Sequence, residues 1–185
     1  MKIKNFEWPK TPSHRLHEKG TFAVTGGTAK KTYLFDTPEK LDKVQEILLK
    51  LAVEFHWQLE AWSLFSNHYH FLVSSKTPEN LDVFIETFHL QTTEMINAID
   101  TVENRKVWSD YSVNKIIMQA SHYAFLNFIH HNSVKHGHGP NAATYRWCSA
   151  GWFERVHDQE YVKKVKRFNS KSFGINNLTI VDDFA

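Results

Sequence analysis

Two apolar runs lie next to each other in this chain and are separated by only two polar residues. The first run is Trp57 to Ser66, the second is Tyr69 to Ser75, and Asn67 and His68 lie between them. Short runs rich in aromatic and aliphatic residues indicate strands, and so short a connection is typical of an antiparallel pair. This pair constrains the fold most, because the rest of the chain must cover a sheet built on it.

Strand and helix patterns alternate around this pair. We expect a strand at 21–28, one or two strands within 106–118, and helices from residue 38 onwards, over 81–99 and over 120–135. The first helix has Thr37 as a common N-cap and Pro38 at its first position, and apolar residues then recur at helical spacing to Phe55. The order predicts an α+β fold, an antiparallel sheet with helices packed on one face.

The length fits one domain with appendages, because domains usually run to roughly 100 to 200 residues. We expect an N-terminal arm at 1–20, a core at 21–140, and a C-terminal extension at 141–185 that ends in an acidic tail with Asp182 and Asp183. Hydrophobic residues make up 42% of the chain, which excludes a disordered chain.

Neither a membrane span nor a signal peptide is visible. No window reaches the ~18 apolar residues that a membrane helix needs, and the first residues lack an apolar run. The single cysteine, Cys148, cannot form an internal disulfide, which fits a reducing compartment. We therefore expect a cytoplasmic protein without a membrane partner.

Histidine is the residue type in which the composition departs most from an ordinary chain. There are 12 histidines, whereas 22 basic and 20 acidic side chains leave a net charge of only +2. So low a charge excludes a strongly basic nucleic-acid coat. Imidazoles close to neutrality can bind metals or carry protons, so their placement decides what they do.

His68 and His70 flank Tyr69 in one of the predicted strands. Residues two apart on a strand point to the same face, so both imidazoles face one side and Tyr69 faces the other. Two imidazoles can hold a divalent metal, but they do not make a site without a third ligand. The same pattern also fits a pair of ordinary surface histidines.

The third predicted helix ends in a second cluster, NFIHHNSVKHG. At about 100° per residue, Phe128 and Asn132 lie one turn apart on a common face, and His131 lies within about 60° of Phe128. This helix can therefore add Asn132 or His131 to the histidine pair. The alternative is that Phe128 and Ile129 are core contacts and the polar residues only end the helix.

Several of these segments together resemble a known family. NHYHFLV resembles the HUH motif of single-strand DNA endonucleases, in which two histidines flank one bulky residue, and LNFIHHNSVKHG resembles the helix of the REP-associated tyrosine transposases. RKVWSDY, YRWCSAGWFER and the terminal DDF are similar to further segments of the same group of IS200-like transposases, in the same order. The resemblance spans residues 20–184.

The resemblance implies a ferredoxin-like (RRM-like) fold and an enzyme that cleaves and rejoins DNA. In that family a tyrosine hydroxyl attacks the scissile phosphate with the help of a metal, leaving a 5′-phosphotyrosine and a free 3′-OH. Carried over by position, His68, His70 and Asn132 are the metal ligands, and the cofactor is Mg²⁺ or Mn²⁺. The implied partner is a palindromic repeat hairpin with a single-stranded flank, bound by a monomer or a homodimer.

The chain departs from the family at the nucleophile. The family tyrosine aligns with Phe128, which has no hydroxyl, so we expect this chain to be defective in cleavage. Three explanations are open: an engineered change, an inactive copy kept for binding hairpins, or another tyrosine that takes over. Tyr69 points away from the metal face and Tyr123 lies about 140° around the helix, whereas spacing leaves Tyr111 open.

DNA binding needs cations for phosphates and flat side chains for unpaired bases. The candidate cations are Lys30, Lys31, Arg105, Lys106, Lys115, Lys135 and the basic run 163–167. The candidate stacking residues are Trp62, Trp108, Trp147 and Trp152. Each of these residues, taken alone, also fits a solvated lysine or a core tryptophan.

Overall fold

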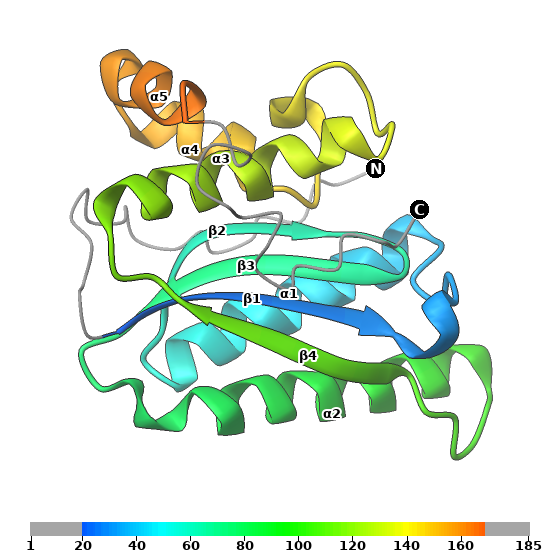
Figure 1. Ribbon diagram of the computed structural model, residues 1–185. Coiled ribbons are helices and arrows are strands. Elements are labelled where there is room, and N and C mark those ends of the chain that lie inside the picture. The colour runs from blue at the N-terminus through cyan, green and yellow to red at the C-terminus, as the bar shows by residue number, and fades with distance from the viewer. Residues whose placement is uncertain (1–19, 169–185) are drawn as a thin grey trace.

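Four antiparallel strands form the centre of the protein, for which a computed structural model describes residues 20–168 (Figure 1). The strands are β1 (Thr21–Thr28), β2 (Gln58–Leu64), β3 (His68–Ser74) and β4 (Trp108–Lys115). Their order in the sheet is β2-β3-β1-β4, and every pair is antiparallel. With helices after β1 and β3, this is the predicted ferredoxin-like arrangement. Nearly all of the predicted arm and the acidic tail with Asp182 and Asp183 lie outside the described residues.

Five α-helices surround the sheet within residues 20–168. They are α1 (Pro38–Glu54), α2 (Leu81–Asp100), α3 (Gln119–Lys135), α4 (Ala150–Val156) and α5 (Gln159–Lys166), and short 3-10 turns occur at η1 (Ala29–Lys31), η2 (Pro78–Asn80) and η3 (Ala142–Thr144). The predicted start of α1 is confirmed, because the Thr37 hydroxyl accepts a hydrogen bond from the Lys40 amide at 3.3 Å. No helix within residues 20–168 has the length and apolar character needed to span a membrane.

The helices cover both faces of the sheet. In Figure 1, α1 and α2 lie under one face, as predicted, and α3 crosses the opposite face with α4 and α5 beyond it. The side chains of β3 alternate accordingly: the ring of Phe71 contacts Phe84 of α2, whereas the ring of His70 contacts Phe128 of α3. The expectation of helices on one face therefore holds for α1 and α2 only. All of β3 is buried, so its second face needs a covering helix as well.

Tyr69 anchors the core between the sheet and α2. Its ring packs edge-on against Phe88 with centroids 5.3 Å apart, and its hydroxyl lies 2.7 Å from Nε2 of His89. The residue opposite Tyr69 on β1 is Gly26, where a Cβ atom would lie only 2.6 Å from three atoms of the tyrosine side chain. The glycine therefore makes room for the ring, and Tyr69 faces away from the histidine pair, as predicted.

The free edge of β2 is covered by the segment that leads into α4. The Leu64 amide donates to the Trp147 carbonyl at 3.0 Å, and the Ser149 amide donates to the Trp62 carbonyl at 2.9 Å. These bonds satisfy the outer polar groups of an edge strand, which would otherwise pair with other chains. The C-terminal extension is thereby joined to the sheet.

Three of the four tryptophans proposed to stack on bases lie in the interior. Trp62, Trp108 and Trp152 are buried, so the prediction that they bind DNA is wrong. Two of the indoles find hydrogen-bond acceptors inside the protein: Nε1 of Trp62 donates to Gln45, and Nε1 of Trp108 donates to Thr92. Trp147 is half-buried, and its Nε1 donates to Asp42 at 2.9 Å.

Candidate functional site

His68 and His70 lie side by side on β3 and face α3. Their ring centroids are 5.2 Å apart, and both side chains are buried. The ordinary surface pair that the sequence left open is therefore excluded. The arrangement follows from the alternation of a strand, which turns both imidazoles toward the helix that covers this face.

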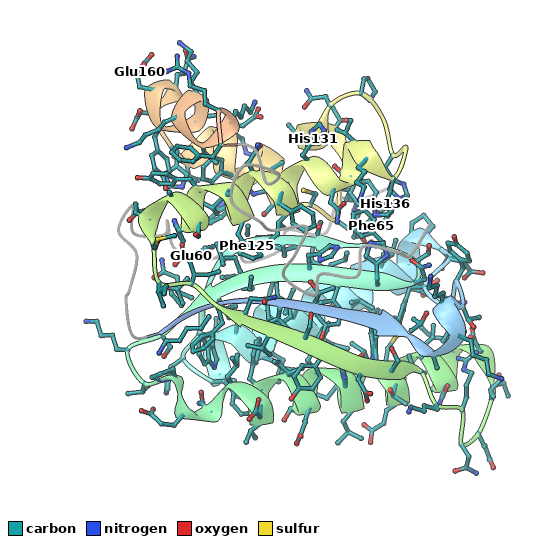
Figure 2. The ribbon with its side chains drawn as sticks, in the orientation of Figure 1. Glu60, Phe65, Phe125, His131, His136 and Glu160 are labelled. Carbon is teal, nitrogen blue, oxygen red and sulfur yellow. The ribbon has the colours of Figure 1, made fainter. Side chains whose placement is uncertain are left out.

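Helix α3 brings Asn132 opposite the histidine pair. The ring of Phe128 lies 5.3 Å from the ring of His70, and the ring of His136 lies 4.7 Å from the ring of His68. Asn132 lies one turn after Phe128 and one turn before His136, so it occupies the middle of the same helix face. His131, the other candidate ligand, is exposed and in Figure 2 lies on the side of α3 away from the sheet.

The side chain of Asn132 has unsatisfied hydrogen-bonding capacity. It is buried, and within residues 20–168 neither Oδ1 nor Nδ2 has a hydrogen-bond partner. Burial of an amide without hydrogen-bond partners costs free energy. Such a buried, unsatisfied group is typical of a position that binds an ion or a ligand. Asn132 therefore fits the part of a third ligand.

Two hydrogen bonds orient the imidazoles. Nδ1 of His68 lies 2.7 Å from Oδ1 of Asn67, and the amide group of Asn67 in turn donates from Nδ2 to the Lys31 carbonyl at 3.4 Å. Because an amide oxygen only accepts, Nδ1 of His68 carries the proton and Nε2 carries the lone pair that a metal needs. Nδ1 of His70 lies 2.8 Å from the Thr25 hydroxyl on β1.

Burial keeps both imidazoles in the neutral form that binds metals. It lowers the pKa of His70 to about 3, and Lys135 contributes a further lowering. Burial, and then the neighbouring charge of His70, hold the pKa of His68 far below its ordinary value. The unprotonated ring is therefore available near pH 7.

The donor set fits a divalent cation only if Asn132 takes part. Within residues 20–168 no group of three or more histidine, cysteine, aspartate or glutamate side chains is placed to hold a metal ion. Two imidazole nitrogens and an amide oxygen are nevertheless acceptable ligands, and imidazole suits transition metals better than Mg²⁺.

Comparison with known proteins identifies the family. The family model described as "Transposase IS200 like" matches residues 25–132, which is more than half of the chain. The chain belongs to the IS200-like transposase family. No curated protein matches it.

Two solved structures resemble this IS200-like chain. The structure of a REP-associated tyrosine transposase bound to a REP hairpin matches with a TM-score of 0.58 at 12% identity, covering 80% of this chain and 89% of that one. A proposed transposase from Deinococcus radiodurans matches with a TM-score of 0.45 at 12% identity, covering 58% and 85%. At this identity the first match shows the fold, which agrees with the predicted ferredoxin-like architecture.

Phe128 lies at the centre of the site of this IS200-like protein. It is half-buried, and its ring packs edge-on against His70. Tyr111, which spacing left open as a replacement nucleophile, pairs with Gly26, as Tyr69 does from the other side. Tyr111 and Tyr69 therefore share the face turned toward α2, and neither can reach the histidine face.

The remaining tyrosine of α3 is also held away from the site. Tyr123 is buried, with its ring 5.9 Å from that of Tyr161 on α5 and 5.1 Å from that of Phe168. Nζ of Lys164 lies over the same ring, 4.9 Å from its centroid. The position of Tyr123 on the α5 side of the helix agrees with the angle predicted from the sequence.

Four of the predicted DNA-binding cations gather at the His68 end of the sheet. They are Lys30, Lys31, Lys106 and Lys135. Lys30 and Lys31 form the turn after β1, where the Lys31 carbonyl accepts from Asn67, next to His68. The Ala29 amide donates to the Val107 carbonyl, which brings Lys106 to the same turn, and Lys135 ends α3 on the other side of the histidines.

Two predicted cations do not belong to this group. Lys115 pairs with Phe22 at the opposite end of β1. Arg105 donates to Asp100 at 2.8 Å and to the Asn97 side chain at 2.9 Å, so its guanidinium has a structural role between α2 and the loop before β4. Lys115 lies at the far end of the sheet from His68 and is therefore excluded from the site. The charge of Arg105 is already paired with Asp100, which explains its position without DNA.

An aromatic stack completes the site, and the sequence did not reveal it. The ring of Phe65 lies 4.4 Å from that of His68, and the ring of Tyr145 lies 5.6 Å from Phe65 on a nearly parallel plane. Figure 2 shows Phe65 and His136 together below the end of α3. His136 could have been found from its spacing of eight residues from Phe128, but Tyr145 reaches the stack only through tertiary packing.

Proposed function

We propose that this protein binds a DNA hairpin with a single-stranded flank on the face of the sheet that carries His68 and His70. Membership of the IS200-like transposases supports this, and so does the fold, which resembles a REP-associated transposase bound to a REP hairpin. The cations Lys30, Lys31, Lys106 and Lys135 at this end of the sheet supply positive charge for the phosphates. The buried single cysteine, Cys148, fits the cytoplasmic setting that we propose.

The proposed ligands of a divalent cation are His68, His70 and Asn132. Mn²⁺ or Mg²⁺ would polarise the scissile phosphate when bound. The residues around it have separate tasks: Asn67 and Thr25 hold the two imidazoles, and Lys135 adds positive charge near the phosphate.

The proposed reaction lacks its nucleophile in this chain. In the family chemistry the tyrosine oxygen forms a bond to phosphorus, the bond from phosphorus to the 3′ oxygen breaks, and the tyrosine proton leaves while the 3′ oxygen gains one. Phe128 offers a ring at this position but no oxygen. The observation that carries the proposal is its ring contact with His70 at 5.3 Å, which puts position 128 beside the proposed ligands. We therefore propose a protein that binds hairpins and does not cleave them.

The experiment compares the chain with Phe128 and its Phe128→Tyr variant. Each protein is incubated with a labelled hairpin oligonucleotide that carries a single-stranded flank, with Mn²⁺ or Mg²⁺, and covalent adducts are resolved on a denaturing gel. We expect an adduct with Phe128→Tyr only, and equal hairpin binding by both proteins. The control is Phe128→Tyr combined with His70→Ala, which keeps the hydroxyl and removes a proposed ligand.

Each outcome separates a different part of the proposal. An adduct formed by the chain with Phe128 contradicts the assignment of position 128. An adduct that survives His70→Ala contradicts the proposed ligands. A protein that binds hairpins and random single strands equally well contradicts the proposed DNA target. Sedimentation of the same complexes distinguishes the monomer from the homodimer.

A further inference from the structure

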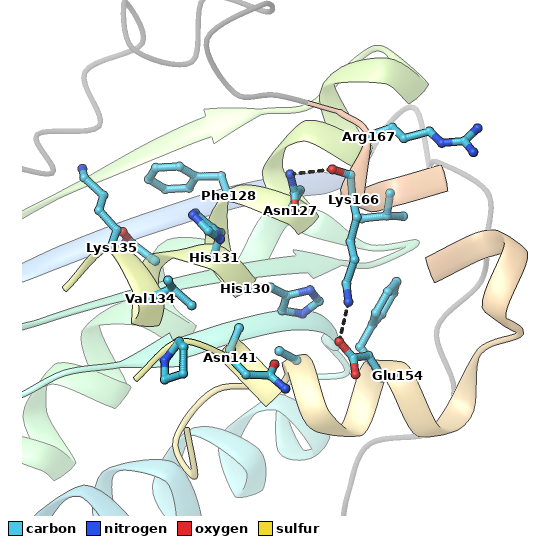
Figure 3. A pocket seen from close by; sticks show the side chains of 16 residues that line it. Asn127, Phe128, His130, His131, Val134, Lys135, Asn141, Glu154, Lys166 and Arg167 are labelled. Atoms are coloured by element: carbon cyan, nitrogen blue, oxygen red, sulfur yellow. Dashed lines mark hydrogen bonds and ion pairs between the residues drawn. The ribbon is translucent and has the colours of Figure 1, made fainter. Parts of the chain in front are cut away.

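A groove lies between α3 and the pair formed by α4 and α5, on the outer side of the site (Figure 3). Its volume is about 890 Å³, which lies in the range of pockets that hold organic ligands. The loop around η3 closes one end, and the end of α5 with Arg167 forms the opposite wall. The proposed reaction uses only Phe128, Asn132 and Lys135 from the α3 wall and gives no role to the rest of the groove.

The described walls of the groove carry more positive than negative charge. Lys135, Lys166 and Arg167 line it, and Glu154 is the only carboxylate among the described lining residues. Nζ of Lys166 lies 2.8 Å from Oε1 of Glu154, a contact drawn as a dashed line in Figure 3. The groove therefore favours an anionic ligand.

The same walls offer groups that recognise bases. His131 is exposed on α3 and presents a flat ring. Nδ2 of Asn127 already donates to the Phe168 carbonyl and Oδ1 of Asn141 already accepts from the Ala143 amide, so these two amides offer the groove their other polar atom, Oδ1 and Nδ2 respectively. Imidazole rings can stack on unpaired bases, and amides can hydrogen-bond to base edges. Cations and flat or amide side chains in one groove are the combination that single-stranded nucleic acid requires.

The groove is continuous with the proposed reaction site. Phe128 and Asn132 both line it, and the ring of Phe128 also contacts His70. A strand whose phosphate lies at His70 can therefore continue past Phe128 into the groove without crossing the body of the protein. A double-stranded stem needs an open surface, so the unpaired part of the substrate suits the groove.

We infer that this groove binds the single-stranded flank of the DNA, with Lys135, Lys166 and Arg167 on the phosphates and His131 against a base. This inference rests on the proposed function, because it assumes that the phosphate next to the flank lies at His70. Lys166 and Arg167 are the members of the basic run 163–167 that line the groove. Lys163 pairs with Glu160, and Lys164 covers Tyr123.

The test measures the affinity of the full chain for three labelled oligonucleotides without added metal. They are a hairpin with a single-stranded flank, the same hairpin without it, and the flank alone, each followed by fluorescence anisotropy. The variant Lys166→Ala with Arg167→Ala removes two exposed cations of the groove that have no part in the proposed reaction site. Its matched control, Lys50→Ala with Lys163→Ala, removes two exposed lysines on α1 and α5 that do not line the groove.

We expect the groove variant to lose at least tenfold in affinity for the flanked hairpin and for the flank alone, and to keep its affinity for the bare hairpin. The log–log slope of flank affinity against salt concentration is expected to become shallower by about 0.7 for each phosphate that the variant no longer neutralises. Glu154→Gln should act in the opposite direction and tighten flank binding by about threefold, because it removes the carboxylate that pairs with Lys166.

Equal losses on the flanked and bare hairpins would overturn the inference, as would unchanged flank binding or weaker flank binding by Glu154→Gln. A flank carrying 5-iodouracil gives an independent readout, since its photocrosslink should map to α3 near His131. A crosslink that maps only to other elements would also overturn the inference. If the unsubstituted chain binds no hairpin, the proposed function fails, and the flank alone still decides whether the groove binds single strands.

Discussion

The rings of Phe128 and His70 meet edge-on, with centroids 5.3 Å apart and planes inclined at 77°. One residue comes from α3 and the other from β3, and the sequence separates them by 58 positions. This contact brings position 128, the proposed nucleophile position, next to a proposed metal ligand. It also explains why a single oxygen atom, added by Phe128→Tyr, is expected to complete the site.

Metal binding should depend on Asn132 and not on its neighbour His131. We expect His70→Ala and Asn132→Ala each to weaken Mn²⁺ binding at least tenfold, because each removes a proposed ligand, measured by isothermal titration calorimetry. His131→Ala is the matched control, since this residue is exposed on the same helix. Loss of binding in His131→Ala but not in Asn132→Ala would reverse the assignment of the third ligand.

Asn67 should set the tautomer of His68. In the unsubstituted protein the ¹⁵N chemical shifts of His68 are expected to show a proton on Nδ1, because Oδ1 of Asn67 accepts from it at 2.7 Å. Asn67→Ala should mix the two tautomers and weaken Mn²⁺ binding by about 10-fold to 100-fold. Asn141→Ala, which removes an exposed amide elsewhere, should change neither quantity. A proton found on Nε2 in the metal-free, unsubstituted protein would exclude this role.

The buried contact between Glu60 and His122 should stabilise the packing of α3 on β2. Oε2 of Glu60 lies 2.5 Å from Nε2 of His122, and both side chains are buried (Figure 2 labels Glu60 below α3). His122→Ala should lower the free energy of unfolding by about 3 kcal/mol, measured by urea denaturation, because it leaves the carboxylate buried without its partner.

Replacement of both partners provides the control for this contact. Glu60→Leu combined with His122→Leu should cost far less than His122→Ala, because no buried polar group is then left unpaired. Equal losses in the single and double variants would indicate that lost volume alone, and not the hydrogen bond, determines the effect.

Gly26→Ala should destabilise the fold by about 1 to 3 kcal/mol, because the new Cβ would lie 2.6 Å from the Tyr69 ring. Thermal unfolding followed by circular dichroism measures this loss. In a Tyr69→Leu background the same alanine should cost less, because the planar ring over residue 26 is gone. A full additive loss in the double variant would contradict the proposed clash.

Much of the secondary structure could be predicted from local patterns. The strand at 21–28 has the expected bounds, and α1 begins at Pro38 after the Thr37 cap, because caps and apolar periodicity act over a few residues. The common face of His68 and His70 follows from strand alternation in the same way. The resemblance to IS200-like transposases was also visible in these motifs.

Contacts between distant segments could not be predicted in this way. Nothing local in the sequence indicates that Thr25 bonds to His70, that Glu60 meets His122, or that three tryptophans lie in the interior. Local sequence likewise does not indicate that α3 covers the second face of the sheet. Such contacts depend on strand register and on which surfaces exclude water, and both arise only when the whole chain packs.

The chain's own residues thus specify the strands, the helix starts, the paired histidines and the absence of a hydroxyl at position 128. The packing of α3 across the sheet decides the geometry of the candidate site. It buries the histidines, brings Asn132 opposite them and forms a cationic groove beside Phe128. Local signals act over a turn or a strand, whereas a site built from β1, β3 and α3 requires segments that only hydrophobic burial and sheet pairing bring together.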